Sequence, residues 1–294
     1  MILVTGATGQ LGSAVVHRLL ERTGGADIAA LARDERKAAG LVARGVSVRM
    51  GDYDDTAALD RALAGVDRVL LIAGNTPQRR VQQHQNVIDA ARRAGVGLIG
   101  FASRSLRDVH ASENTLMRDY FETEERIRSS GLPHVLFRNA LYLDTIPAYV
   151  GGSRVFETGI RLSAGDGKVA YALRREMGEA LANAMLDHEG ADRTYVVAAS
   201  RGYTFDDVAA ALTEVSGRSV GYTRISGEEY VADAVRAGVP EPLARRYLGF
   251  CSDIRSGQLD ETSSSLETLL GRPPAILSEG VREIFGLPAS DNRR

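Results

Sequence analysis

Short apolar runs and amphipathic stretches alternate along the first half of the chain. Runs typical of buried strands cover residues 1–4, 27–32, 46–50, 69–73, 97–102 and 134–138. Helical spacing of apolar residues follows the first run as far as residue 20, and recurs over 56–63, 82–94 and 115–130. This alternation predicts an α/β fold, with a doubly wound parallel sheet and helices on both of its faces.

The pattern changes beyond about Tyr142. Six of the eight prolines follow this point, and glycine-rich segments there indicate loops. Helix starts are indicated by N-cap residues at Thr204 with Asp207, at Ser226 with Glu229, and at Ser278. We predict a sheet domain over 1–142 and a smaller substrate-covering lobe over 143–294, with elements that return to the core. One of these is a strand at 194–199.

The opening segment, Met1–Gly12, reads M-I-L-V-T-G-A-T-G-Q-L-G and leads from an apolar strand into a helix. Gly6 would permit a tight turn, Gly9 a close approach of backbone N–H groups to a pyrophosphate, and Gly12 close packing of helix on strand. The helix N-terminus would stabilise an anion. The spacing is G-x-x-G-x-x-G, and any tight strand-to-helix turn can use such glycines. The strand and helix around it favour a dinucleotide site of the Rossmann type.

Two cations follow the second predicted strand. Arg33 stands at its end and Lys37 four residues later. In a dinucleotide fold this position faces the adenosine ribose, where an arginine suits a 2′-phosphate. The pair therefore predicts NADP(H), although R-D-E-R-K can also be an ordinary solvated charged run.

Further candidate cofactor residues stand at the ends of the third, fourth and fifth strands. Asp52 could accept hydrogen bonds from the adenine amino group and Tyr53 could cover its ring, but Asp52 could instead only cap the helix at 56–63. The small residues that begin at Ala73 would leave room for the middle of the cofactor. Ser103 ends the fifth strand.

The usual catalytic pair of short-chain dehydrogenases, Tyr-x-x-x-Lys, is absent. The only lysines are Lys37 and Lys168, and the nearest candidate tyrosine, Tyr120, is followed at the fourth position by Glu124. This argues against sugar epimerases, dehydratases and ordinary carbonyl reductases. The histidines and the single cysteine have no metal-ligand spacing, so no metal site is expected.

Composition excludes several further classes of protein. A formal net charge of -2 indicates no affinity for nucleic acid. The single cysteine, Cys251, excludes an internal disulfide and fits a reducing compartment. No apolar run reaches the length of a membrane span, and the start of the chain lacks the features of a signal peptide. We therefore expect a cytoplasmic protein.

Several motifs together resemble those of one family: V-T-G-A-T-G-Q-L-G, L-A-R-D-E-R-K-A, G-D-Y-D-D, Q-H-Q-N-V-I-D-A-A, L-F-R-N-A-L-Y and A-G-D-G-K. The chain resembles the NmrA-like family of atypical short-chain dehydrogenases, especially its bacterial type 2 NADPH:quinone oxidoreductases and triphenylmethane reductases. The resemblance implies an NADPH-dependent reductase without flavin. It also implies these cofactor residues: Gly6, Ala7, Thr8, Gly9, Gln10, Leu11, Arg33, Ala73, Gly74, Asn75, Phe137, Arg138, Asn139, Ala140, Leu141 and Tyr142.

One departure from the family concerns catalysis. Those reductases often carry histidine where this chain has Tyr120. We expect hydride transfer from NADPH to a quinone-like or other conjugated small molecule, with Tyr120 and Tyr142 nearest that acceptor. Tyr120 could also be only a packed aromatic. Two other functions stay open, a non-enzymatic NADP-binding redox sensor and a tailoring reductase of an aromatic or polyketide pathway. The protein is expected to be a monomer or homodimer.

Overall fold

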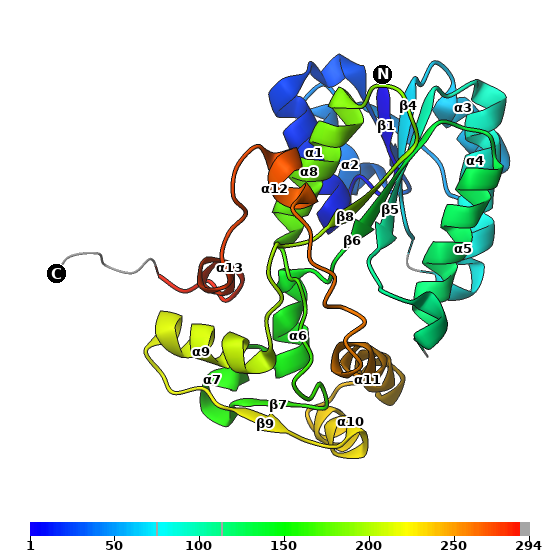
Figure 1. Ribbon diagram of the computed structural model, residues 1–294. Coiled ribbons are helices and arrows are strands. Elements are labelled where there is room, and N and C mark those ends of the chain that lie inside the picture. The colour runs from blue at the N-terminus through cyan, green and yellow to red at the C-terminus, as the bar shows by residue number, and fades with distance from the viewer. Residues whose placement is uncertain (75, 113, 289–294) are drawn as a thin grey trace.

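The computed structural model describes residues 1–74, 76–112 and 114–288, and a parallel β-sheet forms its centre (Figure 1). The seven-stranded sheet has the order β3-β2-β1-β4-β5-β6-β8, so the direction of winding reverses between β1 and β4. Its strands are β1 (Ile2–Val4), β2 (Ile28–Ala32), β3 (Ser47–Met50), β4 (Arg68–Ile72), β5 (Leu98–Arg104), β6 (His134–Asn139) and β8 (Arg193–Val197). The doubly wound α/β sheet is confirmed, as is the late strand, which pairs in parallel with β6.

Helices cover both faces of the sheet (Figure 1). One face carries α1 (Gln10–Arg22), α8 (Arg174–Asp187) and α12 (Ser265–Leu270). The opposite face carries α3 (Thr56–Leu63), α4 (Arg80–Ala94) and α5 (Thr115–Ser129), while α2 (Glu35–Val42) lies between β2 and β3 in the chain. Each face has its own hydrophobic cluster, because the buried strands present apolar side chains on both sides.

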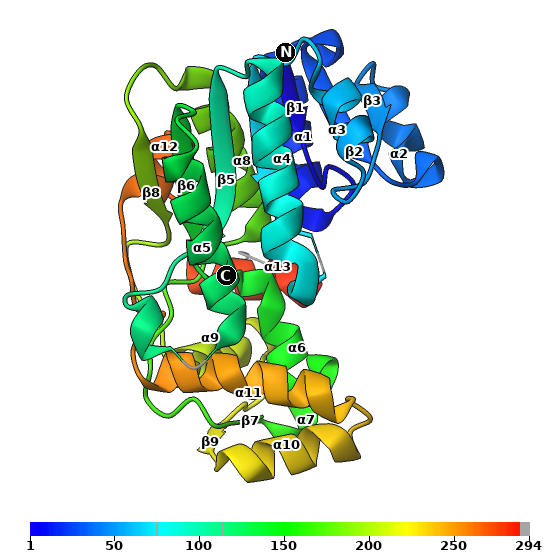
Figure 2. The ribbon, with the colours of Figure 1, turned by 90° about the vertical axis from the view of Figure 1, so that its right-hand side faces the viewer.

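The remaining elements lie beyond the carboxyl ends of the strands (Figures 1 and 2). They are α6 (Ile146–Val150), α7 (Val155–Thr158), β7 (Ile160–Leu162), α9 (Phe205–Ser216), β9 (Tyr222–Arg224), α10 (Gly227–Arg236), α11 (Glu241–Arg255) and α13 (Leu277–Ile284). Strands β7 and β9 form a separate two-stranded parallel sheet. A third hydrophobic cluster joins these elements to one another. Short 3₁₀ helices occur at Gly25–Asp27, Pro77–Arg79, Val109–Ala111, Leu143–Thr145 and Gly152–Arg154.

Helix starts in the second half follow two of the three expectations. Thr204 and Ser226 each form a capping box with the acidic residue three positions later. The prediction at Ser278 is wrong, because α13 already begins at Leu277. There the carboxylate of Glu279 accepts a hydrogen bond of 3.1 Å from the backbone N–H of Ile276. Among the described residues, no helix has the length and hydropathy needed to cross a membrane.

Candidate functional site

The glycine turn, residues 5–12, joins β1 to α1 where the strand order reverses. Gly6 has a φ of +58°, which a side chain would strain, and a Cβ on Gly12 would lie 2.8 Å from the Cα of Ala7. Gly9 is the N-cap of α1, and no described side chain caps the helix. Thr8, Gly9 and Gln10 are exposed. The free N–H groups of α1 therefore face an open surface, a geometry that fits a phosphate group.

Exposed cations stand next to this turn at the end of β2. Arg33 directly follows β2, and its Nη1 lies 3.3 Å from Oδ2 of Asp52. The Arg33 side chain is 70% exposed, so the guanidinium is free to exchange this surface contact for a ligand. Lys37 lies exposed in the first turn of α2, whose N-cap is Asp34. The arrangement leaves two cations available to a 2′-phosphate.

Tyr53, which follows β3, connects the end of that strand to the end of β4. The Tyr53 hydroxyl donates a hydrogen bond of 2.7 Å to the carbonyl of Ile72, and burial raises the pKa of this tyrosine. The helix-capping alternative for Asp52 is wrong, because Asp55 caps α3 by accepting from the N–H of Ala58 at 2.9 Å. Asp52 accepts hydrogen bonds from Arg33 at 3.3 Å and from the backbone N–H of Asp54 at 3.0 Å, so it stands beside Arg33 at the strand ends.

Of the small residues after β4, Ala73 and Gly74 are half-buried. The carbonyl of Gly74 accepts a hydrogen bond of 3.4 Å from Nε of Arg80. Asn75 lies outside the described residues.

A buried carboxylate connects the ends of β5 and β6. Glu124 on α5 is fully buried; it accepts from the Ser103 hydroxyl at 2.6 Å and from Nη2 of Arg138 at 2.7 Å. The predicted cofactor residues Ser103 and Arg138 therefore use their side chains to hold Glu124. Sequence reasoning noted Glu124 only because it stands where the family of short-chain dehydrogenases usually has lysine. Its position four residues after Tyr120 is the feature of the sequence that points to it.

The segment 137–142 is largely core. Phe137 is fully buried and its ring stacks on Tyr195 at 6.1 Å, while Ala140 and Leu141 are also buried. Asn139 differs, because its side chain is 1% exposed and neither amide atom has a hydrogen bond to a described residue. Of the predicted cofactor residues here, Asn139 has the most hydrogen-bonding capacity left for a ligand.

Five side chains alternate across the carboxyl edge of the sheet, and we call them the arginine–tyrosine ladder: Arg80, Tyr120, Arg104, Tyr142 and Arg174. The guanidinium of Arg80 lies 5.3 Å from the ring centre of Tyr120, and that of Arg104 lies 5.8 Å away. Arg104 also lies 4.5 Å from the ring centre of Tyr142, with Arg174 at 4.6 Å. At these distances each ring attracts the cations through its quadrupole.

The ladder is fastened at both ends. Arg80, which is buried, forms an ion pair of 2.7 Å with Asp119 on α5. At the other end, Arg174 donates a hydrogen bond to the side-chain oxygen of Gln10 in the glycine turn. The structure thus brings the predicted residues Tyr120 and Tyr142 together, and connects them to the predicted nucleotide site. Sequence reasoning missed Arg80, Arg104 and Arg174; only the position of Arg104, directly after Ser103 at a strand end, could have drawn notice.

The ladder tyrosines are buried. Both are 8% exposed, and the ring of Tyr120 also stacks on Phe101 at 6.1 Å. Burial raises the pKa of Tyr142, and the nearby Arg104 only partly opposes that effect. The Tyr142 hydroxyl therefore carries its proton at neutral pH and is able to donate a hydrogen bond.

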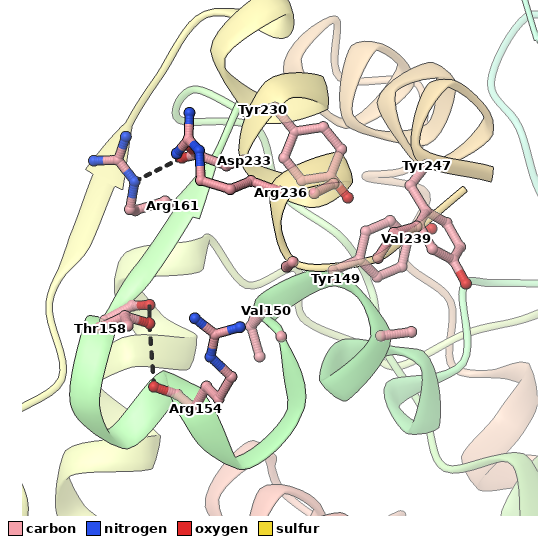
Figure 3. A pocket seen from close by; sticks show the side chains of 15 residues that line it. Tyr149, Val150, Arg154, Thr158, Arg161, Tyr230, Asp233, Arg236, Val239 and Tyr247 are labelled. Carbon is pink, nitrogen blue, oxygen red and sulfur yellow. Dashed lines mark hydrogen bonds and ion pairs between the residues drawn. The ribbon is translucent and has the colours of Figure 1, made fainter. Parts of the chain in front are cut away.

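A separate cavity of about 290 Å³ lies among the elements beyond the sheet (Figure 3). Its lining residues come from 148–161 and 230–247. Tyr149, Tyr230 and Tyr247 contribute aromatic surface, and Arg161 reaches across to Asp233 at 3.0 Å. Since no lining residue comes from the glycine turn or the ladder, a molecule in this cavity would touch neither.

Comparisons with known proteins agree with this geometry. Residues 1–263 match the model of the NmrA-like family. The chain belongs to the NmrA-like family. It is 36% identical over 290 residues to quinone oxidoreductase 2 of Escherichia coli, an alignment that covers 98% of this chain and 99% of that protein. The resemblance inferred from the motifs is confirmed.

Two solved structures share the fold over nearly the whole chain. Citrobacter sp. triphenylmethane reductase complexed with NADP(H) has a TM-score of 0.91 at 37% identity, and the match covers 97% of this chain and 100% of that one. The NADPH-dependent quinone oxidoreductase from Escherichia coli complexed with NADPH has a TM-score of 0.89 at 35% identity, with coverage of 97% and 100%.

Proposed function

We propose that this protein is an NADPH-dependent oxidoreductase that transfers hydride to a quinone-like or other conjugated acceptor, without flavin or metal. The observation that carries this proposal is the hydrogen bond between Arg174 and Gln10, which joins the ladder to the glycine turn. A nucleotide on the turn and a flat molecule on the ladder would then be neighbours. Family membership supports the same activity.

The cofactor would bind across the carboxyl ends of β1, β2 and β4. Backbone N–H groups of Gly6–Leu11 would hold the pyrophosphate, and Arg33 with Lys37 would hold the 2′-phosphate. Asp52, Tyr53, Ala73 and Gly74 would flank the adenosine and the middle of the cofactor. When bound, the nicotinamide supplies the hydride.

The acceptor would lie against Tyr120 and Tyr142. Conjugated acceptors delocalise incoming charge, so they need less proton donation than a simple ketone does. The residues of 143–294 would cover this edge of the sheet and exclude water, which strengthens every polar interaction there. The ladder tyrosines would mainly position the acceptor.

The decisive experiment measures NADPH oxidation by the purified protein with a panel of benzoquinones and naphthoquinones. We expect turnover with NADPH and weaker activity with NADH. The matched control is Gly9→Val, which should remove turnover by removing cofactor binding. Tight NADPH binding without turnover on any acceptor would overturn the reductase proposal and favour the redox-sensor alternative. The cytoplasmic location and the monomeric or homodimeric state stay predictions from the sequence.

A further inference from the structure

Unpartnered polar atoms gather at the ends of β5 and β6. Nη1 of Arg104 and both amide atoms of Asn139 are buried and have no hydrogen bond of ordinary length and angle to any described residue, although the Tyr120 hydroxyl lies near Arg104 and the Tyr142 hydroxyl near Asn139. The two residues are direct partners in the strand register, so their backbones are adjacent. Native proteins rarely leave buried donors unpaired, and several at one point indicate a group that is missing from the protein itself. The position coincides with the middle of the ladder.

The positive charge of Arg104 also has no carboxylate partner among the described residues. Its guanidinium stacks on the rings of Tyr120 and Tyr142, and it forms no ion pair with a carboxylate among the described residues. Neighbouring arginines differ in this respect, since Arg80 pairs with Asp119 and Arg138 pairs with Glu124. A half-buried cation held between two rings, with one N–H unused, is arranged to meet a negative charge from outside the chain.

We propose that Arg104 is a catalytic residue whose Nη1 binds the carbonyl oxygen of the acceptor and stabilises the oxyanion formed on reduction. This inference rests on the proposed function. The acceptor gains a hydride, that is, two electrons and one proton, from a C–H bond of the nicotinamide of NADPH, which breaks as NADPH becomes NADP⁺. A new bond to hydrogen forms on the acceptor, and the conjugated electron pair moves onto the carbonyl oxygen. That oxygen then takes one proton from water. The amide of Asn139 lies beside the same oxygen and completes its hydrogen bonds.

The assignment defines a substrate class. Quinones and enones become oxyanions when they accept hydride, so Arg104 stabilises their transition state more than their ground state. A cationic triarylmethane dye becomes neutral when it accepts hydride, and Arg104 repels it before reaction. Arg104 should therefore favour carbonyl acceptors over cationic acceptors within one site.

The test compares Arg104→Gln with the wild type on a naphthoquinone and on malachite green, a cationic dye. We expect kcat/KM for the quinone to fall about 10²–10³-fold, as when one oxyanion donor is removed, whereas the rate with the dye should stay the same or rise. Arg201→Gln is the matched control, because Arg201 also stacks on a tyrosine ring, at 5.2 Å from the centre of Tyr203, away from the ladder. It should change neither rate.

A second readout needs no turnover. 4-Nitrophenol absorbs visible light as its phenolate, so its apparent pKa on the protein reports the charge it meets. Wild type should lower this pKa, and Arg104→Gln should abolish the shift while NADPH affinity is kept. Arg104→Lys keeps the charge without the planar fork and should restore part of the shift, which provides a test if the glutamine variant does not fold.

The outcomes separate the two proposals. If wild type reduces quinones and Arg104→Gln does so equally well, with unchanged phenolate binding, the role of Arg104 is overturned and the reductase function stands. If wild type reduces no quinone but lowers the pKa of nitrophenol through Arg104, the oxyanion site stands and the reductase function falls. Equal losses with quinone and cationic dye would also contradict the assignment, because they would indicate a general packing defect.

Discussion

The glycine turn and the arginine–tyrosine ladder lie next to each other, yet they are built in different ways. The turn is formed within residues 5–12. Its shape depends on Gly6, whose φ of +58° would strain a residue with a side chain, and on Gly12, where the backbone leaves no room for a Cβ. The ladder takes its five side chains from α4, α5, the end of β5, the segment after β6, and α8. A local site is specified by adjacent residues, whereas the ladder exists only when distant elements have packed.

The two regions should also respond differently to substitution. A substitution in a site built from backbone should abolish ligand binding, because an added side chain occupies the space of the ligand itself. The ladder is a chain of ring–cation contacts, each worth about 0.5–2 kcal/mol. Removal of one hydroxyl or one contact therefore leaves most of the wall intact. Substitutions in each region test this contrast.

Gly9→Val should abolish NADPH binding while the fold survives. Gly9 has φ -83° and ψ 171°, an extended conformation that valine adopts, so the backbone is not strained. Its branched side chain would stand where the pyrophosphate must approach. Calorimetric titration of NADPH measures the loss, and Gly40→Ala is the control, since a Cβ there meets nothing within 4 Å. Normal affinity in a folded Gly9→Val protein would make the turn purely structural.

Glu124→Gln should lower the free energy of unfolding by about 3 kcal/mol, the lower part of the range for breaking a buried ion pair. Glutamine keeps the shape but leaves Arg138 without the carboxylate that now lies 2.7 Å away. Chemical denaturation measures the change. The exposed neighbour Glu125, substituted in the same way, is the control and should change stability little. Equal stability of both variants would show that the ladder side of the sheet does not depend on this carboxylate.

Arg33→Ala should weaken NADPH binding about 10- to 150-fold, the equivalent of about 1.5–3 kcal/mol for a hydrogen bond to a charged group. NADH binding should barely change, because NADH lacks the 2′-phosphate. Titrations of both cofactors against wild type and variant measure this. If both affinities fell equally, Arg33 would not be a ligand of the 2′-phosphate, and the end of β2 would not distinguish NADPH from NADH.

His84, beside Arg80 at one end of the ladder, should make stability depend on pH. Burial is the main cause that lowers its pKa to about 3, so the folded protein holds it neutral. The unfolded chain protonates histidine near pH 6.5. The free energy of unfolding is therefore highest above pH 6.5 and decreases as the pH falls toward 3, by up to about 1.4 kcal/mol per pH unit. We expect the free energy of unfolding, measured by denaturation across this pH range, to depend more steeply on pH in wild type than in His84→Gln. An equal dependence in both proteins would contradict the assignment.

Tyr120→Phe should lower kcat by less than about tenfold, well short of the 10²–10⁴-fold typical of a general acid. The ring keeps its stack on Phe101 and its contacts with two guanidiniums, and only the hydroxyl is removed. Steady-state NADPH oxidation with a quinone measures the effect. A loss above about a hundredfold with intact NADPH affinity would make Tyr120 the proton donor, and would move the substrate from quinones toward simpler carbonyl compounds, whose oxyanion needs a proton.

Features that depend on neighbouring residues can be predicted from the amino-acid sequence. The strands and helices of the sheet follow from local periodicity, and the glycine turn from residues within one strand–helix junction. Arg33 was placed because it directly follows a strand, and strand ends in a parallel sheet share one edge. The error at Ser278 is of the same local kind, since the N-cap of α13 is Ile276, two residues earlier, and the side chain of Glu279 accepts from its backbone N–H.

Contacts between distant side chains appear only once the elements have packed. Arg80, Arg104 and Arg174 look like ordinary surface cations in the sequence, because nothing near them indicates a partner. They become a ladder because α4, β5 and α8 converge at the carboxyl edge of the sheet. The adjacency of Arg104 and Asn139 depends on the register between β5 and β6, and a shift of one residue would turn each side chain to the opposite face. Register and packing arise from the whole core, so the chemistry of the acceptor site emerged only with the fold.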